Sequence, residues 1–385
     1  MLACFVLATC AWGFGFYGHG VFLAELQRQH GWSTSLISGA TTAYYLVGGV
    51  LVAFTADGIA RVGPRRFVLA AAATLGLSAA LIPQVQTPWQ LYAVYILMAA
   101  GWAGTSLAAI VTVLGLWFDK RRGLAMSLAL NGASAGSVVV VPLLVGMTAW
   151  LGFRAAVAAS VLLFALLLVP MVLAWVDRPS AAWAPPSADA VEAPWSKGRI
   201  LGDIGFWSMA VPFSLGIAAQ AGFLMHQYAA LEPILGNVNT GFAVALTGAF
   251  AIIGRVGLGF FIDRVSPRGA AALLLLLHAA ALAAIAHTRS PAVLYAACAA
   301  YGLGVGNIIT LPPLVIQREF PAAQFATIAS LATAVAGLTY AFGPAALGLL
   351  RDASGAYVVP LLFCAGVDVL AAVLVLWRPR AAARP

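Results

Sequence analysis

Charged residues are scarce in this chain of 385 residues, of which only 8% are Asp, Glu, Lys or Arg. Hydrophobic residues, in contrast, make up 63% of the chain. A water-soluble domain of this length does not need so large an apolar fraction to fill its core. The composition therefore excludes an ordinary soluble domain and favours a chain that resides in lipid.

Cysteine is also rare, and the four cysteines show no metal-ligand spacing. Cys4, Cys10, Cys298 and Cys364 all fall within apolar runs, where we expect buried free thiols without a functional role. The chain also lacks a P-loop, a nucleophile elbow and paired carboxylates inside apolar runs. The sequence therefore predicts no enzyme, no metal and no cofactor.

Long apolar runs are abundant and rich in Leu, Ala and Gly. A helix needs roughly 20 apolar residues to cross the hydrocarbon core of a bilayer. The alternating ten-residue pattern of a membrane β-barrel is absent, so we expect an all-α membrane protein. Its twelve predicted spans are 2–26, 34–57, 67–86, 89–117, 124–149, 154–176, 204–231, 238–262, 269–288, 291–316, 325–349 and 356–377.

The basic residues that produce the net charge of +8 are unevenly distributed. Fifteen of the 20 Lys and Arg residues lie on one alternating set of loops and chain ends. The other set holds Arg28, Arg154, Arg289 and Arg351, and Arg255 alone lies inside a span. Because Lys and Arg collect on cytoplasmic loops, this bias predicts an inner-membrane protein with both termini in the cytoplasm. It gives no support to nucleic-acid binding.

A polar stretch at 177–203, rich in proline and small residues, predicts a solvated linker between a bundle at 1–176 and a second bundle at 204–385. Each part contains six predicted spans. Pro64-Arg65 after the second span matches Pro267-Arg268 after the eighth at an offset of 203 residues. Further matches at the same spacing indicate two parallel structural repeats.

The loops after the second and eighth spans resemble the G-x-x-x-D-R-x-G-R-R signature of the major facilitator superfamily. In the first loop, Ala56 and Ala60 replace the Gly and the Asp of the signature. The resemblance implies two pseudo-symmetric six-helix bundles and a rim motif that pairs with helix ends and carboxylates to lock one conformation. The motif residues are Asp57, Arg61 and Arg65 in the first copy and Gly259, Asp263, Arg264 and Arg268 in the second.

A narrower resemblance, to the monocarboxylate porter and oxalate:formate antiporter branches, is carried by Gly31-Trp32-Ser33, 117–125, Gly254-Arg255 and 352–357. It implies that Arg255 holds a substrate carboxylate. The chain departs from the first branch at Ala251, where those porters carry an aspartate that serves as a proton site. It departs from the second branch in the eleventh span, which lacks the lysine expected there.

Arg255 is the sharpest candidate from the residues themselves. It lies about eight residues, or roughly 12 Å, before the predicted end of the eighth span, too deep to reach the rim easily. Its guanidinium is always charged and offers a planar fork to a carboxylate. One buried cation suits one carboxylate, because a second negative charge would stay unmatched in a low dielectric. The alternative is a side chain turned to the cytoplasmic rim and paired with Asp263 or with a helix C-terminus.

Neutral and titratable side chains inside spans are the remaining candidates. Each one is either a substrate contact or a bond between helices. Histidine titrates near neutral pH, so His226 and His19 are candidates for proton coupling, although a membrane histidine more often bonds to a backbone carbonyl. Asp368 is expected to face another helix or the rim. The possible substrate contacts are Tyr17, Gln220, Asn131, Asn307 and Tyr340, with Tyr44 and Tyr45 as further cavity residues.

The sequence thus predicts a secondary transporter that moves a small organic anion, with a monocarboxylate favoured, by alternating access. Proton symport and anion exchange both remain open. The alternatives are efflux of amphipathic or drug-like compounds and a membrane sensor that does not transport. We expect a monomer whose partners are the anion, protons and the lipid bilayer.

Overall fold

The computed structural model describes residues 1–117, 122–176 and 195–378. Within these ranges the chain forms helices and contains no strand. Twelve of its helical segments are long and apolar enough to cross a membrane. The expected all-α membrane protein with twelve spans is therefore confirmed.

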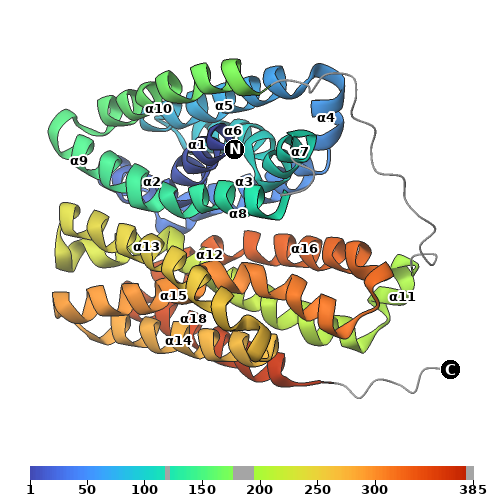
Figure 1. Cartoon of the computed structure of the whole chain (residues 1–385). Helices are drawn as coiled ribbons and strands as arrows, with labels where there is room; N and C mark the ends of the chain where they lie inside the picture. Colours follow the sequence, from blue (N-terminus) through green and yellow to red (C-terminus); the bar gives the residue numbers. More distant parts are fainter. Residues whose placement is uncertain (118–121, 177–194, 379–385) are drawn as a thin grey trace.

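The first six spans form one bundle, which is the upper layer of Figure 1. Two short π-helical segments interrupt its first and fifth spans. The elements are α1 (Leu2–Trp12), π-helical η1 (Gly13–Tyr17), α2 (Gly18–His30), α3 (Thr34–Val52), α4 (Thr55–Val62), α5 (Pro64–Leu81), η2 (Ile82–Gln84), α6 (Pro88–Thr105), α7 (Leu107–Trp117), α8 (Arg122–Ala135), π-helical η3 (Gly136–Val140), α9 (Val141–Leu151) and α10 (Phe153–Trp175).

The last six spans form the second bundle, which is the lower layer of Figure 1. A short helix precedes them at the end of the polar stretch. The elements are α11 (Lys197–Leu201), α12 (Ile204–Leu235), α13 (Asn237–Phe261), η4 (Ile262–Arg264), α14 (Pro267–His287), α15 (Pro291–Glu319), η5 (Ala322–Gln324), α16 (Phe325–Ala341), α17 (Gly343–Ser354) and α18 (Val358–Leu376).

Some span limits differ from those expected. The second span ends at Val52, and the polar residues up to 62 form the separate helix α4. The first span continues past 26 to His30, where Gly31 adopts a positive φ of 66° and ends the helix. Hydropathy marks the part of a helix that lipid requires, whereas capping residues decide where the helix ends, so the two limits need not coincide.

Equivalent arginines brace the two bundles in the same way. Arg65, at the start of α5, donates from Nε to the carbonyl of Val176 over 3.1 Å. Arg268, at the start of α14, donates from Nη1 to the carbonyls of Val375 and Trp377 over 3.0 and 3.1 Å. Each arginine thus binds the carbonyl end of the last helix of its own bundle, where a cation is electrostatically favoured. This correspondence supports the pseudo-symmetric relation of the two bundles.

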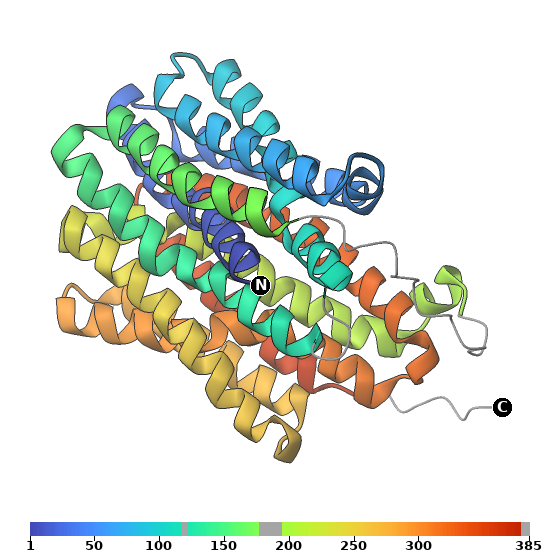
Figure 2. The ribbon, with the colours of Figure 1, turned by 45° about the horizontal axis from the view of Figure 1, so that its top comes forward.

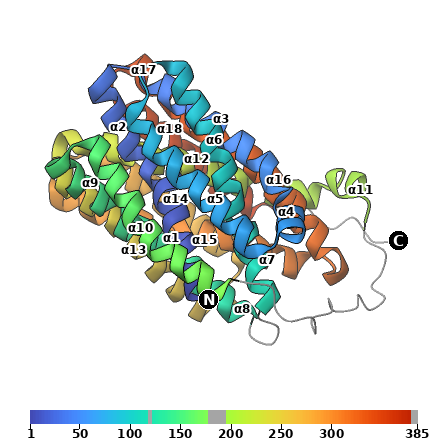
Figure 3. The same ribbon diagram turned by 90° about the horizontal axis from the view of Figure 1, so that it is seen from above.

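The helix ends define two faces of the molecule. The distal face carries the connections at 31–33, 85–87, 152, 236, 288–290 and 355–357, and the linker face carries the opposite helix ends. Figure 3 places α2, α9 and α17 toward the distal end and α4, α7 and α11 toward the other. In Figure 2, α1 lies between α8 and α10, which surround it inside the first bundle.

The two bundles meet chiefly near the distal face. There α17 packs on α3, α12 packs on α2, and α13 packs on α9 and η3. The approach of α17 to α3 is so close that a Cβ atom at Gly348 would lie 3.0 Å from Ser35 Cα. The interface is therefore closed on the distal side.

Candidate functional site

Arg255 reaches from the second bundle to the first. Its Nη1 donates to Asn131 Oδ1 over 3.0 Å, and its Nη2 lies 3.4 Å from Ser134 Oγ on the same helix, α8. Among the polar contacts between bundles in the described ranges, this one lies nearest to the linker face. Arg255 sits six residues before the end of α13, slightly less deep than the predicted eight.

The guanidinium of Arg255 keeps most of its hydrogen-bonding capacity unused. Two of its five N–H donors meet Asn131 and Ser134, and Nε is buried with no partner. No carboxylate in the described part of the chain forms an ion pair with it. A charged fork held by neutral groups inside a membrane span is a suitable receptor for an anion.

A glycine makes room for this arginine. A Cβ atom at Gly306 on α15 would lie 2.6 Å from Nη2 and 2.9 Å from Nε of Arg255. The same atom would lie 3.0 Å from the carbonyl oxygen of Ala251. The guanidinium therefore packs directly on the backbone of α15 at Gly306, and this contact limits its position on that side.

The π-helical segments η1 and η3 pack on each other beside the arginine. A Cβ atom at Gly136 would lie 2.6 Å from the backbone nitrogen of Gly13, so the two backbones are in direct contact. Such segments often occur at functional sites because they turn one side chain out of helical register. Tyr17 ends η1, is buried, and lies within electrostatic range of Arg255.

Aromatic rings adjoin Tyr17 and connect the bundles. Tyr45 of α3 meets Tyr340 of α16 edge to face with centroids 5.0 Å apart. Phe16 contacts Tyr17 at 5.1 Å and Tyr45 at 6.1 Å. We call Phe16, Tyr17, Tyr45 and Tyr340 the aromatic layer. The neighbouring Tyr44 is engaged elsewhere, because its hydroxyl donates to the carbonyl of Gly15 over 2.7 Å.

The two other amide candidates have different surroundings. Gln220 on α12 is buried, and its Oε1 has no partner in the described structure. Asn307 on α15 donates from Nδ2 to the carbonyl of Leu303 in its own helix over 2.8 Å. Gln220 thus retains an open acceptor, whereas the amide nitrogen of Asn307 serves its own backbone.

His226 belongs to the closed distal side rather than to the surroundings of Arg255. Its Nε2 lies 3.0 Å from the carbonyl of Pro344 and 3.2 Å from Ser38 Oγ. A carbonyl can only accept, so Nε2 carries the hydrogen and Nδ1 accepts from the Tyr357 hydroxyl at 3.2 Å. Burial raises the pKa of Tyr357, which keeps that hydroxyl available as a donor.

His19 is enclosed by aromatic rings inside the first bundle. Its ring stacks on Tyr95 with centroids 5.3 Å apart and meets the edge of Tyr44 at 4.9 Å. Neither ring nitrogen has a hydrogen-bond partner. The structure therefore brings neither of the two candidate histidines into contact with Arg255.

Polar contacts on the distal face join the bundles without any signal in the sequence. Arg28 of α2 forms ion pairs with Glu25 of its own helix and with Glu232 of α12. Asp352 of α17 accepts from the backbone nitrogens of Thr34 and Ser35, over 3.1 and 2.7 Å, at the start of α3. A carboxylate at a helix N-terminus is electrostatically favoured. We call these contacts the distal closure.

A cavity of about 690 Å³ opens beside the distal closure. Arg28, Arg289 and Arg351 contribute to its walls, together with Glu232 and Tyr357. Arg255 does not line it. The cavity is therefore separate from the arginine site.

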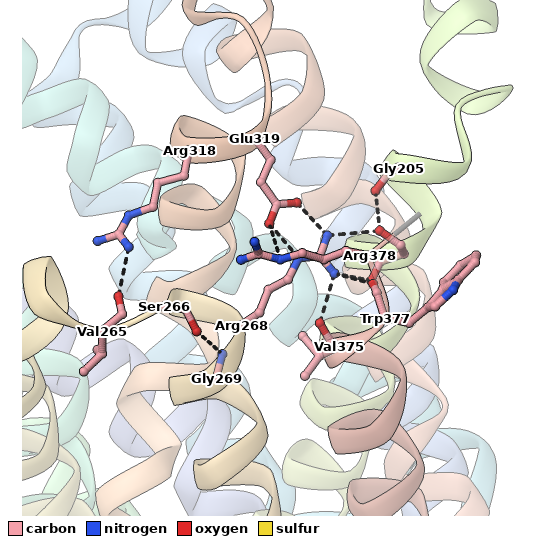
Figure 4. A network of polar contacts seen from close by, with 11 residues as sticks. Gly205, Val265, Ser266, Arg268, Gly269, Arg318, Glu319, Val375, Trp377 and Arg378 are labelled. Atoms are coloured by element: carbon pink, nitrogen blue, oxygen red, sulfur yellow. Dashed lines mark hydrogen bonds and ion pairs between the residues drawn. The ribbon is translucent and has the colours of Figure 1, made fainter. Parts of the chain in front are cut away.

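The second copy of the predicted rim motif is built around Arg268, as Figure 4 shows. This side chain is only 2% exposed and forms a two-pronged ion pair with Glu319, with Nε to Oε1 at 2.8 Å and Nη2 to Oε2 at 2.7 Å. Arg318 donates to the carbonyls of Ile262 and Val265 in the motif loop. All these contacts lie within the second bundle, so here they brace one bundle and do not join the two.

The remaining motif residues are less engaged. Asp57, Arg61 and Arg264 are exposed, and a Cβ atom at Gly259 would meet open space, so no close helix approach occurs there. The side chain of Asp263 lies outside the described residues. The alternative pairing of Arg255 with Asp263 therefore stays a prediction.

The described residues contain no group of three or more His, Cys, Asp or Glu side chains that could hold a metal ion. The four cysteines are buried free thiols, as expected.

Ser134 was not among the candidates predicted from the sequence. It follows Asn131 by nearly one helical turn and lies on the same face of α8.

Comparison with known proteins gives consistent matches. The family model described as Major Facilitator Superfamily matches residues 5–344. A putative tartrate transporter of Agrobacterium vitis is 24% identical over 92% of this chain and 84% of its own length. Monocarboxylate transporter 3 of Rattus norvegicus is 27% identical over 96% of this chain and 77% of its own. A solved bacterial homologue of the human lysosomal transporter Spinster superposes with a TM-score of 0.75 at 14% identity, covering 97% and 95% of the two chains.

Proposed function

The chain belongs to the major facilitator superfamily of membrane transporters, and we propose that it moves a small organic anion, a monocarboxylate, across the inner membrane by alternating access. The observation that carries this proposal is the guanidinium of Arg255. It lies between the bundles and is held by Asn131 and Ser134, which are both neutral. The names of the tartrate and monocarboxylate relatives support organic anions as the substrate class.

A carboxylate bound at Arg255 would contact both bundles at once. The arginine belongs to the second bundle, and its partners Asn131 and Ser134 belong to the first. Neutralising the guanidinium lowers the cost of burying it, so the bound anion favours an occluded state that the empty site disfavours. This difference in affinity between states is what a ligand needs in order to shift a conformational equilibrium.

One cation favours one negative charge on the substrate. Arg255 is the single Lys or Arg that lies away from the ends of the predicted spans. A dicarboxylate bound there would bury a second charge without a partner, at a cost of several kcal/mol. A monocarboxylate leaves no such charge.

The linker face is proposed to be cytoplasmic because it carries most of the basic residues. The distal closure then separates Arg255 from the outside, and this conformation faces the cytoplasm. Opening of the distal face requires breaking the Arg28–Glu232 ion pair and the hydrogen bonds of Asp352 to α3.

The test is uptake of labelled lactate, pyruvate, tartrate and oxalate into proteoliposomes that contain the purified protein. We expect saturable uptake of at least one monocarboxylate, reduced about 30-fold or more in kcat/KM by Arg255→Gln, because an interaction with a buried charge is worth about 2–5 kcal/mol. Arg154→Gln, at an exposed position on the distal face, removes the same charge and is the matched control. Unchanged uptake in Arg255→Gln would refute the proposal.

Efflux of amphipathic compounds is the second candidate, and the aromatic layer favours it. Phe16, Tyr17, Tyr45 and Tyr340 offer ring surface that suits a flat apolar ligand. Transport of a lipophilic dye that survives Arg255→Gln but is lost in Tyr340→Ala would select efflux over anion transport.

A further inference from the structure

Several buried polar side chains in the second bundle have no hydrogen-bond partner in the described structure, and three of them are titratable and fully enclosed. These three are Asp368 of α18, Tyr301 of α15 and His278 of α14, and each is 0% exposed. Both carboxyl oxygens of Asp368, the hydroxyl of Tyr301 and both ring nitrogens of His278 are unpaired. Buried polar groups are normally paired, so each such exception calls for an explanation.

These side chains lie close together although they come from three helices. The rings of His278 and Tyr301 stack with centroids 4.0 Å apart and an interplanar angle of 17°. A Cβ atom at Gly216 would lie 3.9 Å from Asp368 Oδ1 and 2.6 Å from Leu275, which precedes His278 by nearly one turn. Tyr301 lies within electrostatic range of Asp368. We call Asp368, Tyr301 and His278 the buried triad.

Within the described part of the chain, no cation forms an ion pair with Asp368. The titratable groups within electrostatic range of it are Tyr301 from α15 and Cys364 from its own helix, and His278 of α14 stacks on the ring of Tyr301. From α12, Asp368 meets the Gly216 backbone, and Cys364 beside it contacts the carbonyl of Ala219. An ionised carboxylate in such surroundings is far more costly to bury than a protonated one. These surroundings therefore favour the protonated form of the carboxyl group.

The helix α15 contributes Tyr301 to the buried triad and also contacts the anion site. On one side Gly302 and Gly306 pack on α13, where Gly306 touches Arg255. On the other side Tyr301 and Gly304 pack on His278. Tyr301 is also within electrostatic range of Tyr17, which interacts with Arg255. A change of charge at Asp368 and a change of charge at Arg255 thus act on the same helix.

We propose that Asp368 is the proton-binding site that couples anion movement to the proton gradient, with Tyr301 and His278 as the groups that surround it. The inference rests on the proposed transport function. The carboxyl binds one proton from the outer solution as the anion binds Arg255, and it releases that proton to the cytoplasm when the anion leaves. One proton and one monoanion move together, so the cycle carries no net charge.

The other buried titratable groups fit this role less well. Glu25 is buried but paired with Arg28, and His226 is engaged by the carbonyl of Pro344 on the closed distal side. His19 packs against aromatic rings, and no described carboxylate forms an ion pair with it. Among the described residues, Asp368 alone combines a buried carboxylate with the absence of a partner.

The first test is Asp368→Asn in proteoliposomes with labelled lactate and pyruvate. With a gradient of about one pH unit, a one-to-one symporter accumulates its anion about tenfold. We expect wild type to reach this level and Asp368→Asn to show no accumulation, while anion counterflow without a gradient stays within about twofold of wild type. Asp203→Asn makes the same substitution at a helix-capping position that asparagine also suits, and it should accumulate normally.

The second test is independent of transport. Infrared spectra of the reconstituted protein should contain the C=O band of a protonated carboxyl group at neutral pH, and Asp368→Asn should remove it. The band should weaken as the pH rises from about 5 to about 9, because coupling requires reversible protonation. Tyr301→Phe keeps the ring stack and should shift the pH at which the carboxyl band weakens. This variant provides the test if Asp368→Asn does not fold.

Normal accumulation by Asp368→Asn, accumulation driven by sodium alone, or a carboxyl band that is absent or independent of pH would overturn the proposal. If wild type moves no carboxylate, the proposed function fails, and the proton site is then decided by the infrared titration alone.

Discussion

Arg255 of α13 donates a hydrogen bond to Asn131 of α8 across the interface of the two bundles, with Nη1 and Oδ1 3.0 Å apart. The contact joins a permanent charge of one bundle to a neutral amide of the other. It fixes the plane of the guanidinium while leaving most of its donors unused. The orientation of the fork, and not only its charge, therefore depends on the first bundle.

Asn131→Leu should weaken anion binding because it removes the group that orients the guanidinium. We expect KM to rise about tenfold, which corresponds to about 1.4 kcal/mol, with kcat changed less. Ser134→Ala should have a smaller effect, because its oxygen lies 3.4 Å from Nη2. Uptake kinetics measure both variants. Equal effects of the two substitutions would show that the Asn131 contact has no special role.

Glu232→Gln should favour opening of the distal face, since it removes the ion pair between Arg28 and the second bundle. The Arg28 side chain is 46% exposed, so we expect only about 0.2–1 kcal/mol and a shift in population of about fivefold at most. Spin labels attached at Trp150→Cys and Ser290→Cys lie on the distal ends of different bundles. Electron paramagnetic resonance then measures the change in the distance between the two labels. Glu25→Gln is the matched control because it removes the partner within the same helix, and a shift as large in that variant would contradict the assignment.

Gly306→Ala should impair binding more than stability. The added methyl group would lie 2.6 Å from Nη2 of Arg255, and the end of this flexible side chain can move away from it. We expect a KM increase of about tenfold or more with only a small fall in the melting temperature, because the methyl group would also lie 3.0 Å from the carbonyl oxygen of Ala251. Gly304→Ala is the informative contrast, because its methyl group would meet the stacked ring of His278 at 2.2 Å and should lower the melting temperature. The prediction fails if Gly306→Ala binds normally.

Arg268→Met should destabilise the second bundle by about 3–5 kcal/mol, because it leaves Glu319 and the carbonyls of Ser208 and Val375 without their buried partner. Arg264→Met, at the exposed motif arginine, should have little effect. Thermal unfolding of the purified protein measures both. Similar melting temperatures for the two variants would show that the network in Figure 4 contributes little to stability.

The spans and the position of Arg255 follow from local sequence. A helix in lipid satisfies its backbone hydrogen bonds within itself, so each span is marked by its own apolar run. A charge within such a run is equally visible. The shared offset of Arg65 and Arg268 indicated two repeats, and their contacts with the ends of the sixth and twelfth spans agree with it.

The partners of Arg255 were only partly predictable. Asn131 was a candidate as a polar residue inside a span, but nothing in the sequence paired it with a residue 124 positions away. Ser134 has a hydroxyl that can also bond to its own helix, so its presence in a span carries little information. Only packing of the two bundles brings both residues to the guanidinium.

The sequence by itself therefore determined the twelve spans, their division into two halves and the one cation within them. The tertiary structure decided which polar side chains meet, as in the pairing of Arg28 with Glu232 and the gathering of Asp368, Tyr301 and His278. The physical reason is that lipid accepts an apolar helix in any rotation about its axis, and such helices are apolar on most sides. The rotation of each helix, and with it the direction of each polar side chain, is set by contacts with its neighbours.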